Sequence, residues 1–108
     1  MYAVIFTAEI NELDDEYNET AKRMRQLAFT DYGCTHMTAT TEGSTEVAIS
    51  YWPTLQQIQQ WKQNVHHLHA QRLGQTKWYK SYKVEVVKIL REYTGGGGGD
   101  KHVTSEQA

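Results

Sequence analysis

Alternating apolar and polar positions predict three strands in the first half of the chain. Residues 2–10 carry an apolar side chain at every second position, which is the periodicity of a strand. Residues 34–41 are rich in threonine and residues 46–52 alternate again, and the short turn at residues 42–44 between them predicts a hairpin. Pro53 ends the third strand, because proline cannot donate to the ladder of backbone hydrogen bonds.

The C-terminal part predicts one more strand and a tail. Residues 78–93 alternate, but the phase changes near Val87, which suggests a β-bulge there. A run of glycines opens residues 95–108, which contain few apolar side chains. We expect one domain over residues 1–94 and a flexible tail after it, with an arm that crosses onto a partner or closes a pocket as the alternative.

Two segments between the strands have helical periodicity. The acidic stretch before residue 16 suits a helix N-terminus, and apolar positions then recur at helical spacing. They are Leu13, Tyr17, Ala21, Met24 and Ala28. Thr54 is placed to cap a second helix, which we expect to continue to about Gly74.

The predicted order, βαββαβ, is that of the ferredoxin-like α+β fold. It gives a four-stranded antiparallel sheet with two helices on one face. The opposite face still carries apolar residues and needs a cover. A second copy on this open face would form a homodimer, and a ligand or a different partner is the alternative.

Composition limits the classes of partner. The chain has 11 basic and 13 acidic residues, a net charge of −2, which does not suit a nucleic-acid binder. The single cysteine, Cys34, excludes an internal disulfide and a cysteine-based metal cluster. Neither a secretion signal nor an apolar run long enough for a bilayer is present, so we expect a cytoplasmic protein without membrane contact.

Four sequences then carry a family resemblance. They are Tyr2-Ala-Val-Ile-Phe, Val47-Ala-Ile-Ser-Tyr-Trp, Trp61 with the histidine-rich segment 65–74, and Tyr82-Lys-Val-Glu-Val-Val. Together they resemble the antibiotic biosynthesis monooxygenase (ABM) domain family over residues 2–93. The resemblance implies a dimeric α+β barrel, in which two sheets pack face to face. Some members of this family oxygenate aromatic polyketides or quinols without metal or flavin, others bind and degrade haem, and many have no known activity.

The haem-degrading branch of the family resembles this chain in part. Its helix tryptophan matches Trp61, and its histidine matches His67 or His69 loosely. Its first-strand asparagine has no match, because Thr7 or Phe6 stands near that place. Haem as a cofactor, with His67 as its ligand, is therefore an alternative hypothesis. Histidines on a helix also form solvated faces, and a tryptophan at this spacing also serves as core.

The oxygenase branch implies chemistry without a cofactor. The site must remove a proton from a phenol or quinol inside an apolar, water-excluding cavity, so that the anion can pass an electron to dioxygen. Trp61 would shape the cavity, His36 or His69 would accept the proton, and Tyr82 would hydrogen-bond the substrate. We therefore predict a monooxygenase that needs no cofactor and acts on a small aromatic molecule. A non-catalytic dimeric domain that binds a metabolite or serves a stress response is the third hypothesis.

Overall fold

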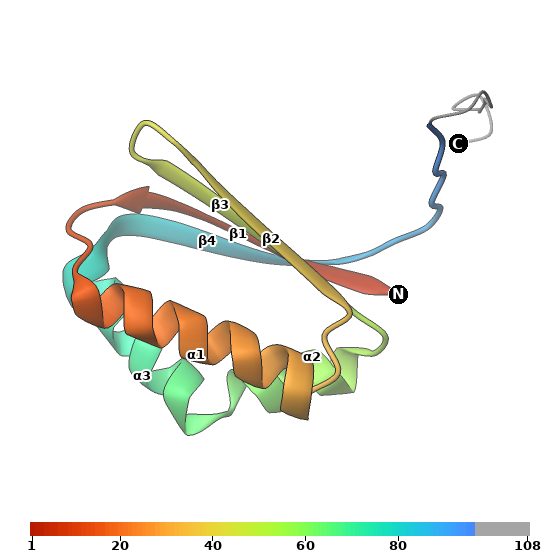
Figure 1. The fold of residues 1–108 in the computed structure, drawn as a ribbon, viewed down its shortest axis with the longest axis horizontal. Coiled ribbons are helices and arrows are strands. Elements are labelled where there is room, and N and C mark those ends of the chain that lie inside the picture. The colour runs from red at the N-terminus through yellow and green to blue at the C-terminus, as the bar shows by residue number, and fades with distance from the viewer. Residues whose placement is uncertain (97–108) are drawn as a thin grey trace.

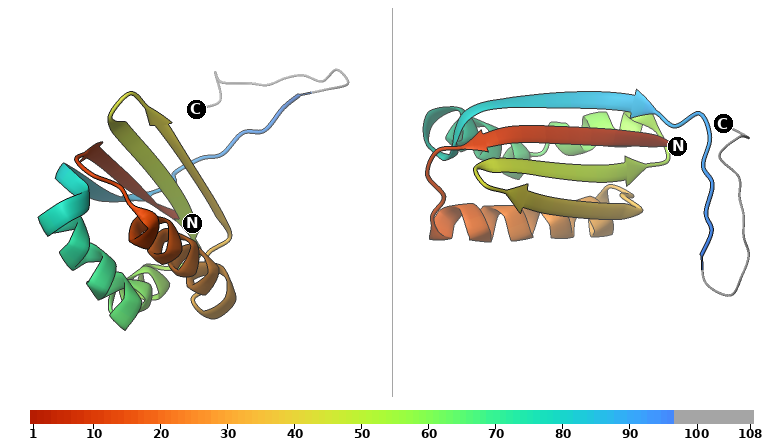
Figure 2. Two further views of the ribbon diagram at one scale, coloured as in Figure 1. Left: turned by 60° about the vertical axis from the view of Figure 1, so that its left-hand side comes forward. Right: turned by 90° about the horizontal axis from the view of Figure 1, so that it is seen from above.

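Four antiparallel strands form one sheet in the computed structural model, which describes residues 1–96. They are β1 (Tyr2–Ile10), β2 (His36–Glu42), β3 (Thr45–Trp52) and β4 (Tyr79–Lys88). Their order across the sheet is β2-β3-β1-β4, which is the ferredoxin-like order (Figures 1 and 2). The predicted hairpin is present: β2 and β3 are joined through Gly43, whose φ of +62° is one that glycine adopts without strain. The predicted fold class is confirmed.

Three helices lie on one face of the sheet (Figure 1). They are α1 (Asp15–Asp31), α2 (Leu55–Lys62) and α3 (Val65–Leu73), and a π-helical turn, η1 (Gly74–Trp78), leads into β4. The prediction of one unbroken second helix was wrong. Asn64 has an extended backbone and its side chain accepts a hydrogen bond from the backbone N–H of His66, so it ends one helix and caps the next.

The register of the strands decides which side chains face the helices. Tyr2 lies opposite Trp52 and Val4 opposite Ser50, so the even-numbered residues of both strands share the helix-covered face. Trp52 is fully buried there. Odd-numbered residues such as Ile49 face the other way, onto the open face of the sheet.

The predicted bulge near Val87 was misplaced. Pairing between β1 and β4 is regular there, with Val87 opposite Ala3, and the register shifts instead at the other end, between Glu9 and Ile10. The last strand, predicted over residues 78–93, is shorter in the structure and ends at Lys88. Because β4 pairs only with β1, and β1 begins at Tyr2 opposite Lys88, no strand remains for it to pair with.

The main cluster of buried apolar residues lies at one end of the space between sheet and helices. It consists of Val4, Ala28, Cys34, Trp52 and Ile58, while Ala3, Ala8, Met24 and Trp78 are buried outside this cluster. The cluster residues come from the start of β1, the end of α1, the segment between α1 and β2, the end of β3 and the middle of α2. The rest of this space is therefore free to hold a site.

Beyond β4 the chain leaves the body of the domain as an extended segment (Figure 1). Ile89 makes a last backbone hydrogen bond to Met1, and Leu90 is 84% exposed. Most of the predicted tail, residues 97–108, lies outside the described residues, so the tail stays a prediction. Within residues 1–96, none of the helices is both long and apolar enough to cross a bilayer.

Candidate functional site

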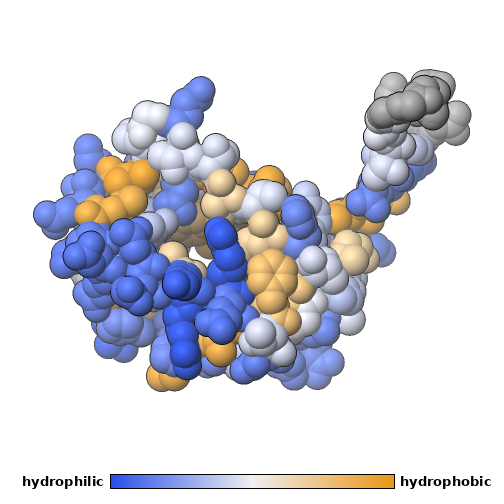
Figure 3. Space-filling view, in the orientation of Figure 1, coloured by the Kyte–Doolittle hydropathy of each residue, from blue (hydrophilic) through white to orange (hydrophobic). Residues whose placement is uncertain are grey.

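A cavity of about 480 Å³ lies between the helix-covered face of the sheet and the helices α1 and α3. Aromatic and aliphatic side chains make up most of its wall, and a few polar groups interrupt them. In the space-filling view the outer face over α1 is mostly hydrophilic, while hydrophobic residues are visible deeper, toward the sheet (Figure 3). This size and lining are typical of small-molecule sites.

Trp61 and His67 meet in the wall of this cavity. Their ring centroids are 4.5 Å apart, and the rings stand edge to face. Trp61 Nε1 and His67 Nδ1 are both buried, and neither has a hydrogen-bond partner. Most buried polar atoms have a partner, so two unpartnered atoms side by side in a cavity wall are unusual and mark this pair as a candidate for ligand binding.

Burial also sets the charge of His67. Loss of solvent around the imidazole, assisted by the nearby positive charge of Lys62, lowers its pKa from 6.5 to about 4. The ring is therefore neutral at physiological pH. A neutral imidazole has one nitrogen that accepts a hydrogen bond, so His67 can accept a hydrogen bond from a ligand hydroxyl, and its lowered pKa makes it a weaker base than a free imidazole.

The break between α2 and α3 selects which histidine faces the cavity. The Asn64 side chain also donates to the hydroxyl of Tyr32, the residue that follows α1, at 3.0 Å, which anchors the start of α3. From that start His67 turns inward. His66 and His69 are exposed, and His69 Nε2 lies 3.5 Å from a Glu16 carboxylate oxygen on α1.

The structure therefore separates the residues chosen from the sequence. Trp61, His67 and Tyr82 line the cavity, whereas His69 and His36 do not. His36 is exposed on the open face of the sheet, with its ring 5.9 Å from that of Tyr51. Because neither His36 nor His69 borders the cavity, the part of proton acceptor that we predicted for them does not fit this geometry.

Tyr82 is placed to contact a ligand through its ring. Its hydroxyl accepts a hydrogen bond from Gln75 Nε2 at 2.9 Å, and its ring stacks on Phe6 with centroids 5.8 Å apart. Phe6 lines the cavity together with Val4 of the same strand, while Thr7 points to the open face. Of the two residues that stand near the place of the asparagine, Phe6 therefore faces the cavity and Thr7 does not, and the phenyl ring of Phe6 has no hydrogen-bonding group.

Sequence reasoning missed a buried carboxylate in the same cavity. Glu46 on β3 is only 8% exposed. Its two carboxylate oxygens accept from the hydroxyl of Tyr17 at 2.9 and 3.0 Å, and Oε1 also accepts from the hydroxyl of Tyr79 at 3.3 Å. Burial is the main cause that raises the pKa of both tyrosines, so they remain protonated donors. A signal was available: Glu46 is a charged residue in the inward phase of an alternating strand.

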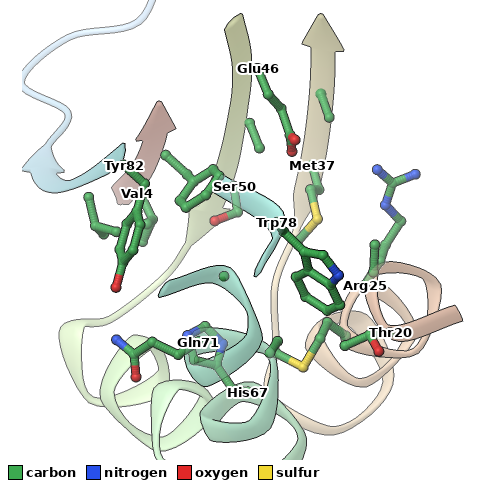
Figure 4. A pocket seen from close by; sticks show the side chains of 18 of the residues that line it. Val4, Thr20, Arg25, Met37, Glu46, Ser50, His67, Gln71, Trp78 and Tyr82 are labelled. Atoms are coloured by element: carbon green, nitrogen blue, oxygen red, sulfur yellow. The ribbon is translucent and has the colours of Figure 1, made fainter. Parts of the chain in front are cut away.

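Glu46 and His67 enter the cavity from opposite sides. Figure 4 shows the carboxylate reaching in from β3 and the imidazole from α3, with Trp78 and Tyr82 on the walls between them. Residues 1–96 contain no group of three or more histidine, cysteine, aspartate or glutamate side chains placed to hold a metal ion. Cys34 lies in the core, and burial raises the pKa of its thiol.

The fold is shared with several solved structures. SnoaB, a cofactor-independent oxygenase from Streptomyces nogalater, has a TM-score of 0.70 and 11% identity, covering 84% of this chain and 94% of SnoaB. Rv0793 from Mycobacterium tuberculosis reaches 0.73 at 14% identity, over 86% of this chain and 98% of its own. An antibiotic biosynthesis monooxygenase reaches 0.65 at 13% identity, over 84% and 100%. The chain therefore has the ABM fold, as the sequence resemblance implied.

A sequence relative fixes the family. YqjZ of Bacillus subtilis strain 168, an uncharacterised protein, is 36% identical over 92 residues, which are 84% of this chain and 81% of YqjZ. The chain belongs to the same protein family as YqjZ. No family model matches it.

Proposed function

We propose that this protein is a monooxygenase that needs no cofactor and acts on a small phenol or quinol. One observation carries the proposal: a neutral imidazole and an indole N–H, both buried and unpartnered, stand together in the wall of an apolar cavity of about 480 Å³. The likeness of the fold to SnoaB, a cofactor-independent oxygenase, supports the same class of reaction.

In the proposed reaction, His67 and Trp61 have different roles. In this proposal the His67 ring accepts the proton of the substrate hydroxyl, and the Trp61 ring, once the substrate displaces its present packing, donates its N–H to the oxygen on which negative charge then develops. Phe6 and Tyr82 supply ring faces for an aromatic substrate. The apolar wall keeps water away from the reactive anion.

Dioxygen is the only oxidant that the reaction needs. The O–H bond of the phenol breaks, its proton moves to His67, and the electron pair stays on the phenolate. The phenolate passes one electron to dioxygen, and the resulting radicals combine to form a carbon–oxygen bond. The O–O bond then breaks: one oxygen stays as a second carbonyl, and the other leaves as water with the two hydrogens that the phenol has lost. Phenol and dioxygen thus give quinone and water.

The test is oxygen uptake with a panel of anthrones and naphthols. We expect uptake by the wild type and a loss of at least about tenfold in His67→Gln, because a proton-transfer group contributes roughly 10²–10⁴ in rate. His66→Gln, an exposed neighbour on the same helix, is the matched control and should keep the rate. Binding without oxygen uptake would instead support a non-catalytic metabolite-binding domain.

Haem binding is a second candidate, favoured by one observation. His67 is the cavity-lining histidine among the described residues, and its neutral imidazole is the side chain that would hold a haem iron. A bound haem would supply the oxygen-activating iron, with His67 as its ligand. Titration with haemin tests this candidate, since a stoichiometric Soret shift that is lost in His67→Gln would support it, and a flat titration would remove it.

We also propose that two copies pair through the open face of the sheet. The two central strands place the apolar side chains of Ile5, Val47 and Ile49 on this face, all of them half-buried in the isolated chain. Sedimentation should therefore give a dimer, and Val47→Asp should give a monomer. A monomeric wild type at micromolar concentration would refute the pairing.

A further inference from the structure

Glu46 is the most unusual polar group in the cavity. A charged side chain is seldom buried without an ionic partner. Among residues 1–96, no ion pair joins Glu46 to a lysine or arginine. Its hydrogen bonds come from two tyrosine hydroxyls, which are neutral donors.

The tyrosines leave part of the carboxylate unused. A carboxylate has about four acceptor positions, and each hydroxyl has one proton to donate. Tyr17 shares its proton between both oxygens, and Tyr79 makes the longer contact to one of them. Glu46 therefore keeps acceptor capacity for a third donor, and it borders the cavity in which a ligand would lie.

The surroundings define the kind of donor. Tyr17 packs edge-on against Trp78 with ring centroids 5.2 Å apart, and Phe6 lies 5.3 Å from Tyr79, so aromatic rings surround the carboxylate end of the cavity. Such walls favour a planar aromatic ligand. A phenolic hydroxyl on the edge of that ligand would donate to the carboxylate in a charge-assisted hydrogen bond.

We propose that Glu46 is a specificity-determining residue that selects aromatic substrates with two hydroxyls on opposite edges. The inference rests on the proposed function, because His67 is taken to receive the reacting hydroxyl, and Glu46 then holds the second one from the opposite side of the cavity (Figure 4). Substrates with a single hydroxyl leave the carboxylate buried without this donor, which weakens their binding.

The experiment compares two probes that differ by one hydroxyl, naphthalene-1,5-diol and 1-naphthol. Their dissociation constants are measured without oxygen, by the quenching of tryptophan fluorescence, so that binding is separated from turnover. We expect the wild type to bind the diol about tenfold to a hundredfold more tightly, the range of a hydrogen bond to a charged group. In Glu46→Gln this preference should fall by about tenfold.

Two further variants keep the test decisive. Glu9→Gln makes the same change to a carboxylate that bonds Ser44 and Thr45 outside the cavity, and it should keep the wild-type preference. Tyr79→Phe frees one acceptor position on Glu46 and should raise the preference for the diol, which decides the matter if Glu46→Gln does not fold.

Equal binding of the two probes by the wild type would overturn the inference, as would an unchanged preference in Glu46→Gln. Either result is independent of oxygen uptake. A wild type that prefers the diol but consumes no oxygen with either probe would refute the oxygenase and leave the role of Glu46 in ligand selection supported.

Discussion

The two sides of the cavity bury their polar groups in opposite ways. On the β3 side, the buried carboxyl group of Glu46 accepts hydrogen bonds from the hydroxyls of Tyr17 and Tyr79. On the helical side, Trp61 and His67 are uncharged at physiological pH, and their buried nitrogens have no partner. The comparison separates two kinds of residue. The hydrogen-bonded cluster of Glu46, Tyr17 and Tyr79 stabilises the fold. The unpartnered nitrogens of Trp61 and His67 destabilise it, and a ligand that hydrogen-bonds them would offset this loss.

The largest expected effect is on the Glu46 side. Glu46→Ala removes the acceptor from two half-buried tyrosine hydroxyls, and we expect it to lower the free energy of unfolding by about 2–3 kcal/mol. Urea denaturation measures this loss. If the cost comes from the unpartnered hydroxyls, then replacing the whole cluster, with Glu46→Leu, Tyr17→Phe and Tyr79→Phe together, should recover most of it. A triple variant with a lower free energy of unfolding than Glu46→Ala would show that the unpartnered hydroxyls are not the cause of the loss.

The next effect depends on pH and concerns the helical side. His67 has a pKa of about 4 in the folded protein and 6.5 when unfolded, so between these values only the unfolded chain binds the proton. The contribution of His67 to stability is fully present above pH 6.5 and is lost as the pH falls toward 4. The slope approaches about 1.4 kcal/mol per pH unit within this window.

The matched comparison for this pH effect is wild type against His67→Leu. The variant lacks the titrating group, while every other ionisable group stays the same. Its free energy of unfolding should therefore rise relative to the wild type as the pH is lowered from 6.5 to 4. Parallel curves for the two proteins would mean that His67 is solvated and that its pKa is ordinary.

A smaller effect separates the two tyrosines that hold Glu46. Tyr17 bonds both carboxylate oxygens at 2.9 and 3.0 Å, and Tyr79 bonds one at 3.3 Å. Hydrogen bonds weaken as they lengthen. Tyr17→Phe should thus cost about 1–2 kcal/mol and Tyr79→Phe less than about 1 kcal/mol. If both variants lose the same free energy of unfolding in urea denaturation, the hydrogen bond of Tyr79 to Glu46 is as strong as that of Tyr17.

Periodicity was enough to predict the fold, because the period of two in the strands and the helical period of residues 13–28 are local properties of the sequence. The strand register, which the sequence does not contain, then places Phe6 and Trp52 on one face of the sheet. Periodicity did not predict where β4 ends, since that depends on where its neighbour β1 begins. The end of β4 is therefore set by its pairing with β1 and not by the sequence of β4 itself.

The site was harder to predict for a similar reason. Trp61 and His67 are six residues apart across a helix break, and the start of α3 at Asn64 resets which histidine faces inward. We assumed one continuous helix, and this assumption does not predict which of His66, His67 and His69 faces the cavity. Glu46 was predictable in principle from its inward phase, but its tyrosine partners lie 29 and 33 residues away along the chain.

The smallest expected change in stability belongs to His67 at neutral pH. His67→Leu exchanges an unpartnered buried ring for an apolar side chain, so no hydrogen bond is lost, and we expect the free energy of unfolding to stay within about 1 kcal/mol of the wild type. The same variant should lose affinity for naphthols and oxygen uptake together. A loss of stability well above this value would mean that His67 has a hydrogen-bond partner within the fold. Another group would then have to accept the hydrogen bond from the substrate.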